Sequence, residues 1–305
     1  MKPPLKTLDA GRTAYAGVGF GLIAYLWWGS AVPIYIHALG RGAWATPPME
    51  LLCQRVVFGI PVLLVLLIAS RRLGELRAAL KSRRMVLVLA CSAALLSANW
   101  FAFIWAVSNA RLLDASLGYY INPLVSVALG VIILGERPRR LQIAAVLMCL
   151  AAVAWLTISR GQLPLVAVTV ALSFGFYGLV RKRASIKAVP GLCVEMMLLL
   201  PIVLGLYAWL FVQGQAALLD GPPVRTGLML LGGVMTAVPL IAFAAAAHRL
   251  RLATLGMLQY LAPTGQFVLS LVFGEQVDPA TLIAFVVIWT ALVLYSWDAW
   301  SANRS

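Results

Sequence analysis

Long apolar runs alternate with short polar breaks along almost the whole chain. A helix of about 20 residues crosses the roughly 30 Å of hydrocarbon in a bilayer, so each run predicts one membrane span. The pattern predicts ten spans: 14–35, 49–69, 85–108, 115–134, 141–158, 164–181, 192–212, 227–247, 254–273 and 280–297. We therefore expect an all-α integral membrane protein.

The fourth and ninth spans share one outline. The segments 111–136 and 249–275 each begin with arginine, place a small hydroxyl residue before Leu-Gly, pass through a proline in mid-segment and end in Gly-Glu. The matching positions are Ser116 and Thr254, Gly118 and Gly256, Pro123 and Pro263, and Glu136 and Glu275. This internal similarity predicts two related units, 1–159 and 160–305.

Each unit would hold five spans, and because five is odd the two units must cross the membrane in opposite senses. Such an inverted repeat is typical of secondary transporters, in which the substrate site lies between the halves near the membrane midplane. We expect ten helices arranged as two inverted five-helix repeats around a central cavity.

The distribution of lysine and arginine predicts the orientation. The tails and even-numbered loops hold 19 basic residues, whereas the odd-numbered loops hold only Arg41, Arg111, Arg160 and Arg225. By the positive-inside rule both termini are expected in the cytoplasm. The net charge of +14 is explained by this topology, because the basic residues do not form a patch interleaved with aromatics, so no nucleic-acid partner is expected.

Composition supports a membrane protein and argues against an enzyme. Hydrophobic residues make up 62% of the chain and charged residues 11%, which is too apolar for a soluble globule. The ten acids form no catalytic cluster, so we expect no catalytic residues and no cofactor. Cys53, Cys91, Cys149 and Cys193 show no metal-ligand spacing and are expected to be small core residues rather than a metal site.

Several strings resemble one known family. They are Asn99-Trp-Phe-Ala-Phe-Ile-Trp-Ala-Val107, Ser116-Leu-Gly-Tyr-Tyr-Ile-Asn-Pro-Leu124, Leu134-Gly-Glu136, Phe174-Gly-Phe-Tyr-Gly-Leu-Val-Arg-Lys182 and Gln259-Tyr260 with Pro263. In this order, over nearly the whole chain, they are similar to the RarD branch of the EamA family in the drug/metabolite transporter superfamily. The resemblance implies a ten-helix carrier of the bacterial inner membrane, and members of this branch are commonly called chloramphenicol-sensitive protein or permease.

Polar side chains within the spans are the candidate binding groups, because burying them in a membrane is costly. In the fourth span Tyr119, Asn122, Ser126 and Gly130 share one helical face, and in the ninth span Gly256, Gln259, Pro263, Ser270 and Gly274 do the same. Helix packing explains the small residues equally well. Lining of the cavity and packing remain alternatives for Tyr119, Asn122 and Gln259.

Charged residues in the second and seventh spans have two interpretations. Arg55 would lie about 10 Å inside its helix, deep enough to be costly yet shallow enough to snorkel. It either binds a substrate or counter-ion, or has a structural role. Glu50 and Glu195 fall in first helical turns, where the helix dipole favours a carboxylate; an acid from another helix, such as Glu195, is a possible partner of Arg55.

The leading hypothesis is a secondary transporter, exporting a small amphiphilic metabolite or drug through a cavity partly lined by aromatic residues. The alternative is a non-transporting membrane scaffold or sensor subunit. The expected partners are a small-molecule substrate and the lipid bilayer, and the protein is expected to be a monomer or homodimer. The candidate substrate-binding residues are Tyr25, Trp28, Arg55, Asn99, Tyr119, Asn122, Tyr177, Glu195, Gln259 and Tyr260.

Overall fold

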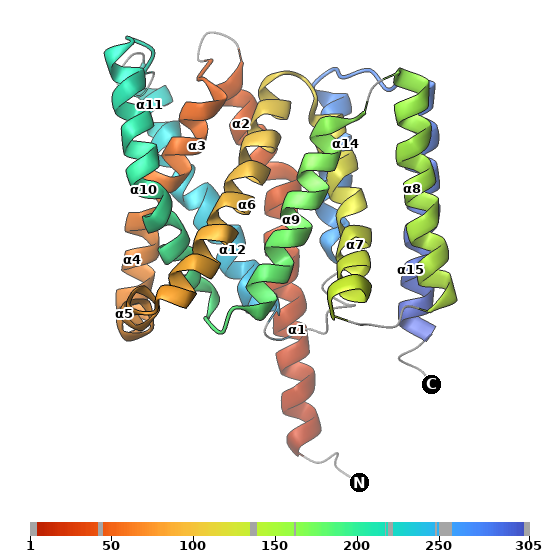
Figure 1. Ribbon diagram of the computed structural model, residues 1–305, viewed down its shortest axis with the longest axis horizontal. Helices are drawn as coiled ribbons and strands as arrows, with labels where there is room; N and C mark the ends of the chain where they lie inside the picture. Colours follow the sequence, from red (N-terminus) through yellow and green to blue (C-terminus); the bar gives the residue numbers. More distant parts are fainter. Residues whose placement is uncertain are drawn as a thin grey trace.

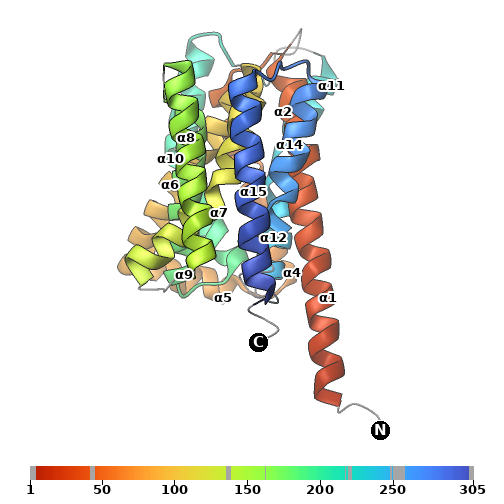
Figure 2. The ribbon, with the colours of Figure 1, turned by 90° about the vertical axis from the view of Figure 1, so that its right-hand side faces the viewer.

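A computed structural model describes residues 5–41, 45–134, 139–161, 163–216, 218, 222–247, 249 and 258–301. Over these residues the chain is a bundle of roughly parallel helices, and none of them lies in a strand (Figure 1). The start of α1 (Leu5–Leu26) extends beyond the rest of the bundle, as both views show (Figure 2). The all-α expectation is therefore confirmed.

Six described helical segments are long and apolar enough to span a membrane: Tyr15–Gly40, Pro48–Ala69, Arg83–Ser108, Arg140–Ser159, Ala188–Val212 and Pro223–Phe243. Shorter apolar helices occupy Leu165–Arg181, Leu261–Val272 and Pro279–Ala291. The expected fourth span corresponds to α7 (Leu112–Leu134). Thr254, Gly256 and Glu136 of the repeated outline lie outside the described residues, as do the side chains of Ser126 and Gly130.

The first span is longer than expected and changes its winding halfway. After α1 the chain forms a π-helical turn, η1 (Trp27–Ala31), and continues as α2 (Val32–Gly40). The Val32 amide donates to the Trp27 carbonyl, five residues back, as a π turn requires. The Trp28 carbonyl accepts a hydrogen bond of 3.2 Å from the Gln266 side-chain amide. This irregular turn therefore packs against another helix through a polar contact.

Proline explains two helix interruptions. Pro61 has no amide hydrogen to offer the Val57 carbonyl, and α3 (Pro48–Val57) ends there before α4 (Gly59–Ala69) begins. The ninth span is interrupted in the same way at Tyr260, and α14 (Leu261–Val272) starts just after it. The mid-segment proline, Pro263, lies in the first turn of α14, just after this interruption, where a missing amide hydrogen costs little.

The segment between the second and third spans contains a helix that the hydrophobic pattern did not predict. This helix, α5 (Leu73–Lys81), buries Leu76 and Ala79 and exposes Arg77 and Lys81, so it is too short and too polar to be recognised as a span. Ser82 then caps α6 (Arg83–Ser108) by accepting a 3.3 Å hydrogen bond from the Met85 amide. Figure 1 places α5 at the end of the bundle where α1 begins and α15 ends.

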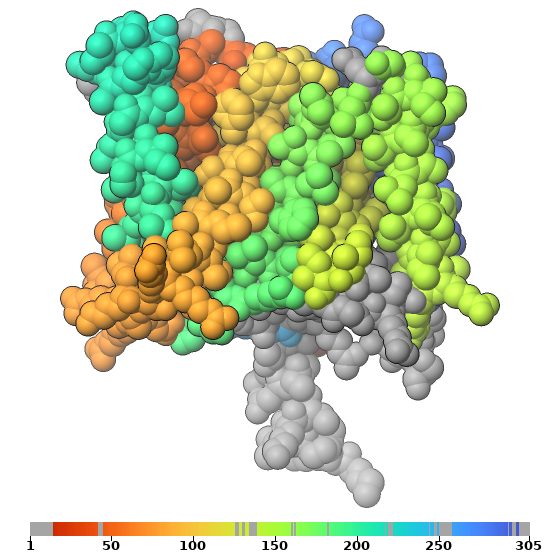
Figure 3. All heavy atoms as spheres, viewed as in Figure 1, coloured from red at the N-terminus to blue at the C-terminus, as the bar shows by residue number. Residues whose placement is uncertain are grey.

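The remaining helices are α8 (Arg140–Arg160), α9 (Leu165–Arg183), α10 (Ala188–Val212), α11 (Pro223–Leu230), α12 (Gly232–Ala247) and α15 (Pro279–Ser301). Helix α9 packs on both α6 and α7, α1 packs on α12, and α8 packs on α15. Figure 3 shows α10, α6, α9, α7 and α8 in a row on one face. The two sequence halves therefore interleave rather than forming separate lobes.

Close packing between α7 and α9 depends on a residue without a side chain. A Cβ atom added at Gly118 would lie 2.6 Å from the Ala167 carbonyl oxygen, too close for any other residue without movement of the backbone. Small residues at such crossings let two helices approach closely in a membrane, where packing rather than water exclusion drives association. Gly118, one of the repeated positions, therefore sets the distance between these two helices.

The outer surface carries large apolar side chains in the open. Ile132 is 79% exposed, Ile158 78% and Val212 81%. Soluble proteins seldom present so many exposed aliphatic side chains over several helices, whereas lipid tails surround them at no cost. This surface is the one expected of a helical bundle in a bilayer.

Candidate functional site

A pocket lies among helices drawn from both halves of the sequence. Its cavity volume in this conformation is about 40 Å³. Its lining is Tyr25, Trp28, Val32, Arg55, Leu96, Asn99, Trp100, Phe103, Tyr119, Phe174, Leu240, Gln259, Ala262, Pro263 and Gln266. An apolar and aromatic wall with a few convergent polar groups is the usual composition of a small-molecule site. Six of the candidate residues predicted from the sequence meet here: Tyr25, Trp28, Arg55, Asn99, Tyr119 and Gln259.

Arg55 is the charged residue of this pocket. Its side chain is only 4% exposed, so it does not snorkel to the membrane surface. Its Nε donates a 2.9 Å hydrogen bond to the Thr236 hydroxyl of α12, and its guanidinium carbon lies 4.3 Å from the centre of the Trp100 ring. Within the described part of the chain, no carboxylate pairs with Arg55.

Glu195 lies elsewhere and has its own partners, so the idea that it pairs with Arg55 is wrong. Its carboxylate accepts a 2.5 Å hydrogen bond from the Ser92 hydroxyl and pairs with Arg181 at 3.4 Å. Tyr177, whose ring centroid lies 5.8 Å from that of Phe174, is a neighbour of this carboxylate. Glu195 and Tyr177 therefore form a buried cluster beside the pocket rather than part of its lining.

Asn99 and Tyr119 are held by hydrogen bonds between three helices. The Tyr119 hydroxyl donates to the Asn99 side-chain oxygen at 3.0 Å. The Asn99 amide donates in turn to the Val170 carbonyl at 3.1 Å and to the Ser173 hydroxyl at 3.2 Å. These bonds join α6, α7 and α9 and fix the orientation of two polar side chains at the pocket wall.

Asn122 and Gln259 come from the two similar spans and contact each other directly. The Gln259 amide donates a 2.9 Å hydrogen bond to the Asn122 side-chain oxygen, and the Asn122 amide donates at 2.9 Å to the Ala171 carbonyl. Gln259 lines the pocket, whereas Asn122 is buried behind it. For Asn122 the structure thus favours a supporting role, since it positions Gln259.

The aromatic side chains form a connected wall. Trp28 lies 5.8 Å from Tyr25 and 6.5 Å from Phe174, and Tyr119 lies 6.2 Å from Phe174 between ring centroids. Phe103 continues the series, 5.8 Å from Tyr119. Edge-to-face pairs at these distances stabilise one another and present ring faces and edges to a bound molecule.

Sequence reasoning missed Trp100, Phe103, Phe174 and Gln266 as lining residues. Gln266 carries a detectable signal, because it is a lone amide in an apolar helix, whereas no periodicity distinguishes the three aromatic residues from membrane-facing ones. Tyr260, a candidate from the sequence, packs against the cluster of α7, α8 and α15 instead of the pocket. Cys91 was expected in the core but is exposed, whereas Cys53, Cys149 and Cys193 are buried.

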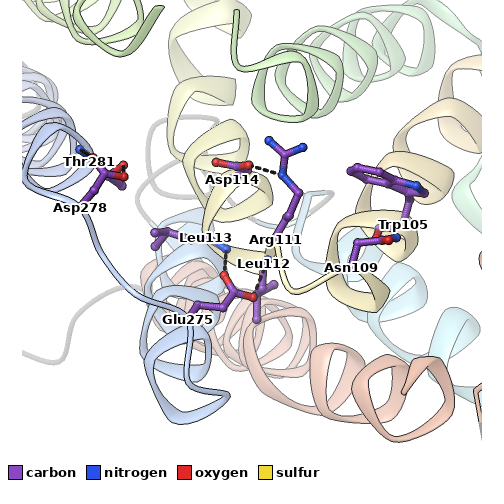
Figure 4. A network of polar contacts seen from close by, with 9 residues as sticks. All are labelled: Trp105, Asn109, Arg111, Leu112, Leu113, Asp114, Glu275, Asp278 and Thr281. Atoms are coloured by element: carbon purple, nitrogen blue, oxygen red, sulfur yellow. Dashed lines mark hydrogen bonds and ion pairs between the residues drawn. The ribbon is translucent and has the colours of Figure 1, made fainter. Parts of the chain in front are cut away.

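A second polar network lies at the end of the bundle opposite α5, where the repeated Gly-Glu motif ends the ninth span (Figure 4). The two carboxylate oxygens of Glu275 accept hydrogen bonds from the backbone amides of Leu112 (2.8 Å) and Leu113 (2.9 Å), at the start of α7. Asp114 pairs with Arg111 at 2.8 Å beside them. Burial raises the pKa of Glu275 above its ordinary value, although both backbone amides act in the opposite direction.

This network assigns a structural role to the motif at Gly274-Glu275. The first four amides of a helix have no partner within the helix. Glu275 satisfies two of these amides in α7 from a position more than 160 residues later in the chain. The corresponding Glu136 lies outside the described residues.

Metal ligation has no support in this region or elsewhere in the part of the chain that the structure describes. No three His, Cys, Asp or Glu side chains among those residues lie close enough to share an ion. The chemistry available at the pocket is hydrogen bonding, charge and aromatic contact, which serve binding.

Comparison with known proteins agrees with this picture. Residues 15–158 match the model of the EamA-like transporter family. An uncharacterized transporter of Pseudomonas aeruginosa is 43% identical, with 94% of this chain and 95% of the relative aligned. Protein RarD of Escherichia coli is 40% identical over 97% of this chain and 99% of its own length. The chloramphenicol-sensitive protein RarD of Pseudomonas aeruginosa is 33% identical, with coverages of 88% and 89%.

A solved crystal structure shares the fold at a TM-score of 0.62 and 21% identity, covering 94% of this chain and 99% of that one. The named relatives are transporters or RarD proteins rather than enzymes, and they align over nearly their full length. This chain, a multi-pass inner-membrane protein, therefore belongs to the EamA-like transporter family and, within it, to the RarD branch.

Proposed function

We propose that this protein is a secondary transporter that exports small amphiphilic molecules, metabolites or drugs, across the bacterial inner membrane through the central pocket. Ten spans form two inverted repeats, 1–159 and 160–305, and the pocket is the site that opens to each side in turn. The observation that carries the proposal is the lining of one pocket by polar side chains from both halves, with Arg55 and Asn99 from the first and Gln259 and Gln266 from the second.

Helix packing supports the repeat. If the halves correspond in order, α6 matches the α11–α12 span and α9 matches the span that begins with α1. The contact of α6 with α9 then has its counterpart in the contact of α12 with α1, and both are extensive. The contacts of α8 with α15 and of α7 with α14 each join a helix to its own counterpart. A twofold relation between the halves predicts this set of neighbours.

Charge and the placement of the ends support the orientation. The charged helix α5 and the ends of the chain that the structure describes lie at one end of the bundle (Figure 1). The 19 basic residues of the tails and even-numbered loops belong to that end under the ten-span assignment. The positive-inside rule makes it the cytoplasmic end.

The test is transport by the purified full-length protein in liposomes and by everted vesicles, with and without a pH gradient, over a panel of amphiphilic metabolites and chloramphenicol. Asn122→Leu and Gln259→Leu should each lower the flux of a transported compound at least tenfold, because leucine cannot make the hydrogen bonds that place Gln259 at the pocket. Thr290→Leu is the matched control, since Thr290 is exposed on α15 and bonds only to its own helix.

Protein amount and the elution profile in detergent should stay the same in all three variants. A cysteine at position 259, in a protein whose native cysteines are replaced, should react with a small water-soluble thiol reagent, and a transported substrate should slow this reaction. The proposal fails if the wild-type protein moves none of the panel, or if Asn122→Leu and Gln259→Leu transport as well as Thr290→Leu.

A further inference from the structure

The pocket contains a buried positive charge, and none of the residues that the structure describes supplies its counter-charge. Arg55 is 4% exposed and lines the pocket. An ionised group inside a membrane protein is normally paired, because removing it from water is costly. The acids that could pair with it therefore have to be located.

Every acid that is buried in the described part of the chain is committed elsewhere. Glu50 accepts hydrogen bonds of 3.0 Å from the Tyr207 hydroxyl and from the Leu218 amide. Glu195 pairs with Arg181, and Asp114 with Arg111. Asp298 lies near the end of α15, a helix that contributes nothing to the pocket. Among the described residues, Arg55 therefore has no carboxylate partner at the pocket.

The guanidinium group of Arg55 is held in place with part of its donor set unused. Its Nε is occupied by Thr236 at 2.9 Å, and Trp100 covers the group at 4.3 Å from the ring centre. Thr236 is itself anchored by donating to the Gly232 carbonyl at 2.9 Å. Within the described chain, Nη1 and Nη2 donate no hydrogen bond to a protein acceptor, although an arginine presents four N–H groups there.

A held guanidinium with free Nη groups is the geometry that binds a carboxylate through two parallel hydrogen bonds. We propose that the transported molecule is a small amphiphilic monocarboxylate, whose anionic group pairs with Arg55 in the pocket. This assignment rests on the proposed transport function and names its substrate class.

Two further polar atoms of the pocket restrict the class. The Tyr25 hydroxyl is buried and has no hydrogen-bond partner among the described residues. Gln266 uses its amide nitrogen on the Trp28 carbonyl, while its side-chain oxygen has no partner in the same part of the chain. The side-chain oxygen of Gln266 can accept a hydrogen bond from an N–H or O–H group of the ligand. The Tyr25 hydroxyl can either donate a hydrogen bond to the ligand or accept one from it.

The rest of the wall calls for an apolar body. Trp28, Phe103 and Phe174 supply aromatic surface, and Leu96 and Leu240 supply aliphatic surface. The described lining contains no acid that could pair with an ammonium group. The pocket therefore favours an anion with a neutral hydrogen-bond donor over a zwitterion or a cationic amphiphile.

Three probes with one aromatic body and different charges test this assignment. At pH 6 N-acetylphenylalanine is an anion, N-acetylphenylalaninamide is neutral, and phenylalaninamide is a cation. Binding to the purified full-length protein in nanodiscs is measured by calorimetry up to millimolar concentration. The wild-type protein should bind the anion at least tenfold more tightly than either of the other two probes.

Arg55→Gln should reduce this preference for the anion to about twofold, while the affinity for the neutral amide stays within about twofold of wild type. Arg55→Lys should give an intermediate preference, since lysine keeps the positive charge but lacks the planar guanidinium group that donates two parallel hydrogen bonds. A purely structural role for Arg55 would weaken all probes together and leave the ratio unchanged. Arg183→Gln is the matched control, because Arg183 is an exposed arginine that does not line the pocket.

The wild-type charge series decides the matter even if the Arg55 variants do not fold. Equal binding of the anion and the neutral amide overturns the assignment, as does a lack of saturable binding by the anion. A preference for the anion that survives in a folded Arg55→Gln protein also overturns it. In the liposome assay, a flux of neutral compounds that depends on Gln259 but not on Arg55 would support the transport function. The same result would contradict the assignment of a carboxylate as the substrate.

Discussion

Replacing Glu275 by glutamine should loosen the first turn of α7, a helix that begins 163 residues earlier in the chain. The two oxygens of Glu275 accept from the Leu112 and Leu113 amides at 2.8 and 2.9 Å. Glutamine has nearly the same size but only one acceptor oxygen, and its NH₂ group would face the second amide. One donor at the start of α7 would then lose its acceptor.

The expected cost is about 1 kcal/mol. Loss of a side-chain cap at a helix start costs roughly 0.5–2 kcal/mol, and an unsatisfied buried donor costs about 1–3 kcal/mol. The lower part of these ranges applies here, because the substitution also removes the cost of burying an ionised carboxylate, the same cost that raises the pKa of Glu275. A difference of about 1 kcal/mol corresponds to roughly a fivefold change in a local opening equilibrium.

Hydrogen exchange followed by mass spectrometry, on protein in nanodiscs, measures this opening locally. Asp278→Ala provides the control, because Asp278 caps its own helix α15 by accepting from the Thr281 amide at 2.8 Å (Figure 4), and alanine removes this acceptor. Glu275→Gln should speed exchange about fivefold in peptides at the start of α7 and leave the start of α15 unchanged. Asp278→Ala should do the reverse.

One outcome would refute the reasoning. If Asp278→Ala speeds exchange at the start of α15 while Glu275→Gln leaves the start of α7 as protected as in wild type, the assay detects the loss of a cap and Glu275 is not acting as one. Water would then satisfy the Leu112 and Leu113 amides as well as the carboxylate does. The Gly-Glu motif would need another explanation.

Three further predictions concern stability and topology. Because burial raises the pKa of Glu275, the folded protein takes up this proton more readily than the unfolded chain, so the melting temperature of wild type relative to Glu275→Gln should rise as pH falls towards 4. Gly118→Ala should destabilise the protein by about 1–3 kcal/mol in detergent melts, whereas Gly178→Ala, where a Cβ meets no atom within 4 Å, should be nearly neutral. Reporters fused after Ser305 or within α5 should be cytoplasmic, and one within 213–226 periplasmic; the opposite result at any of them would break the ten-span assignment.

The positions of the helices could be predicted from the sequence, because lipid imposes a simple rule. A segment in hydrocarbon must satisfy its own backbone hydrogen bonds and present apolar side chains, so length and composition identify it. The rule fails where a helix is amphipathic and lies outside the hydrocarbon, which is why α5 was missed. It also does not register interruptions such as those before Pro61 and Pro263, because a broken helix keeps an apolar composition.

Part of the pocket could be predicted for a related reason. Tyr25, Arg55, Asn99 and Gln259 are polar groups in apolar runs, and such groups are tolerated in a membrane only where they face other protein groups or a cavity. Trp100 and Phe174 could not be recognised as pocket residues in this way, since an aromatic ring is equally stable against lipid, in a protein core or in a pocket. Their position depends on helix rotation, which is set by neighbouring helices.

The sequence by itself determined that the chain is a helical membrane protein, which segments are apolar enough to cross, and which polar groups lie within them, because these properties depend on each segment and its solvent alone. Only the tertiary structure decided which groups meet. It brings Arg55 to Thr236 and Trp100, Glu195 to Arg181 and Ser92, Gln259 to Asn122, and Glu275 to the start of α7. Most of these partners are many tens of residues apart in the chain, so the rotation and register of packed helices, rather than local spacing, bring their atoms into contact.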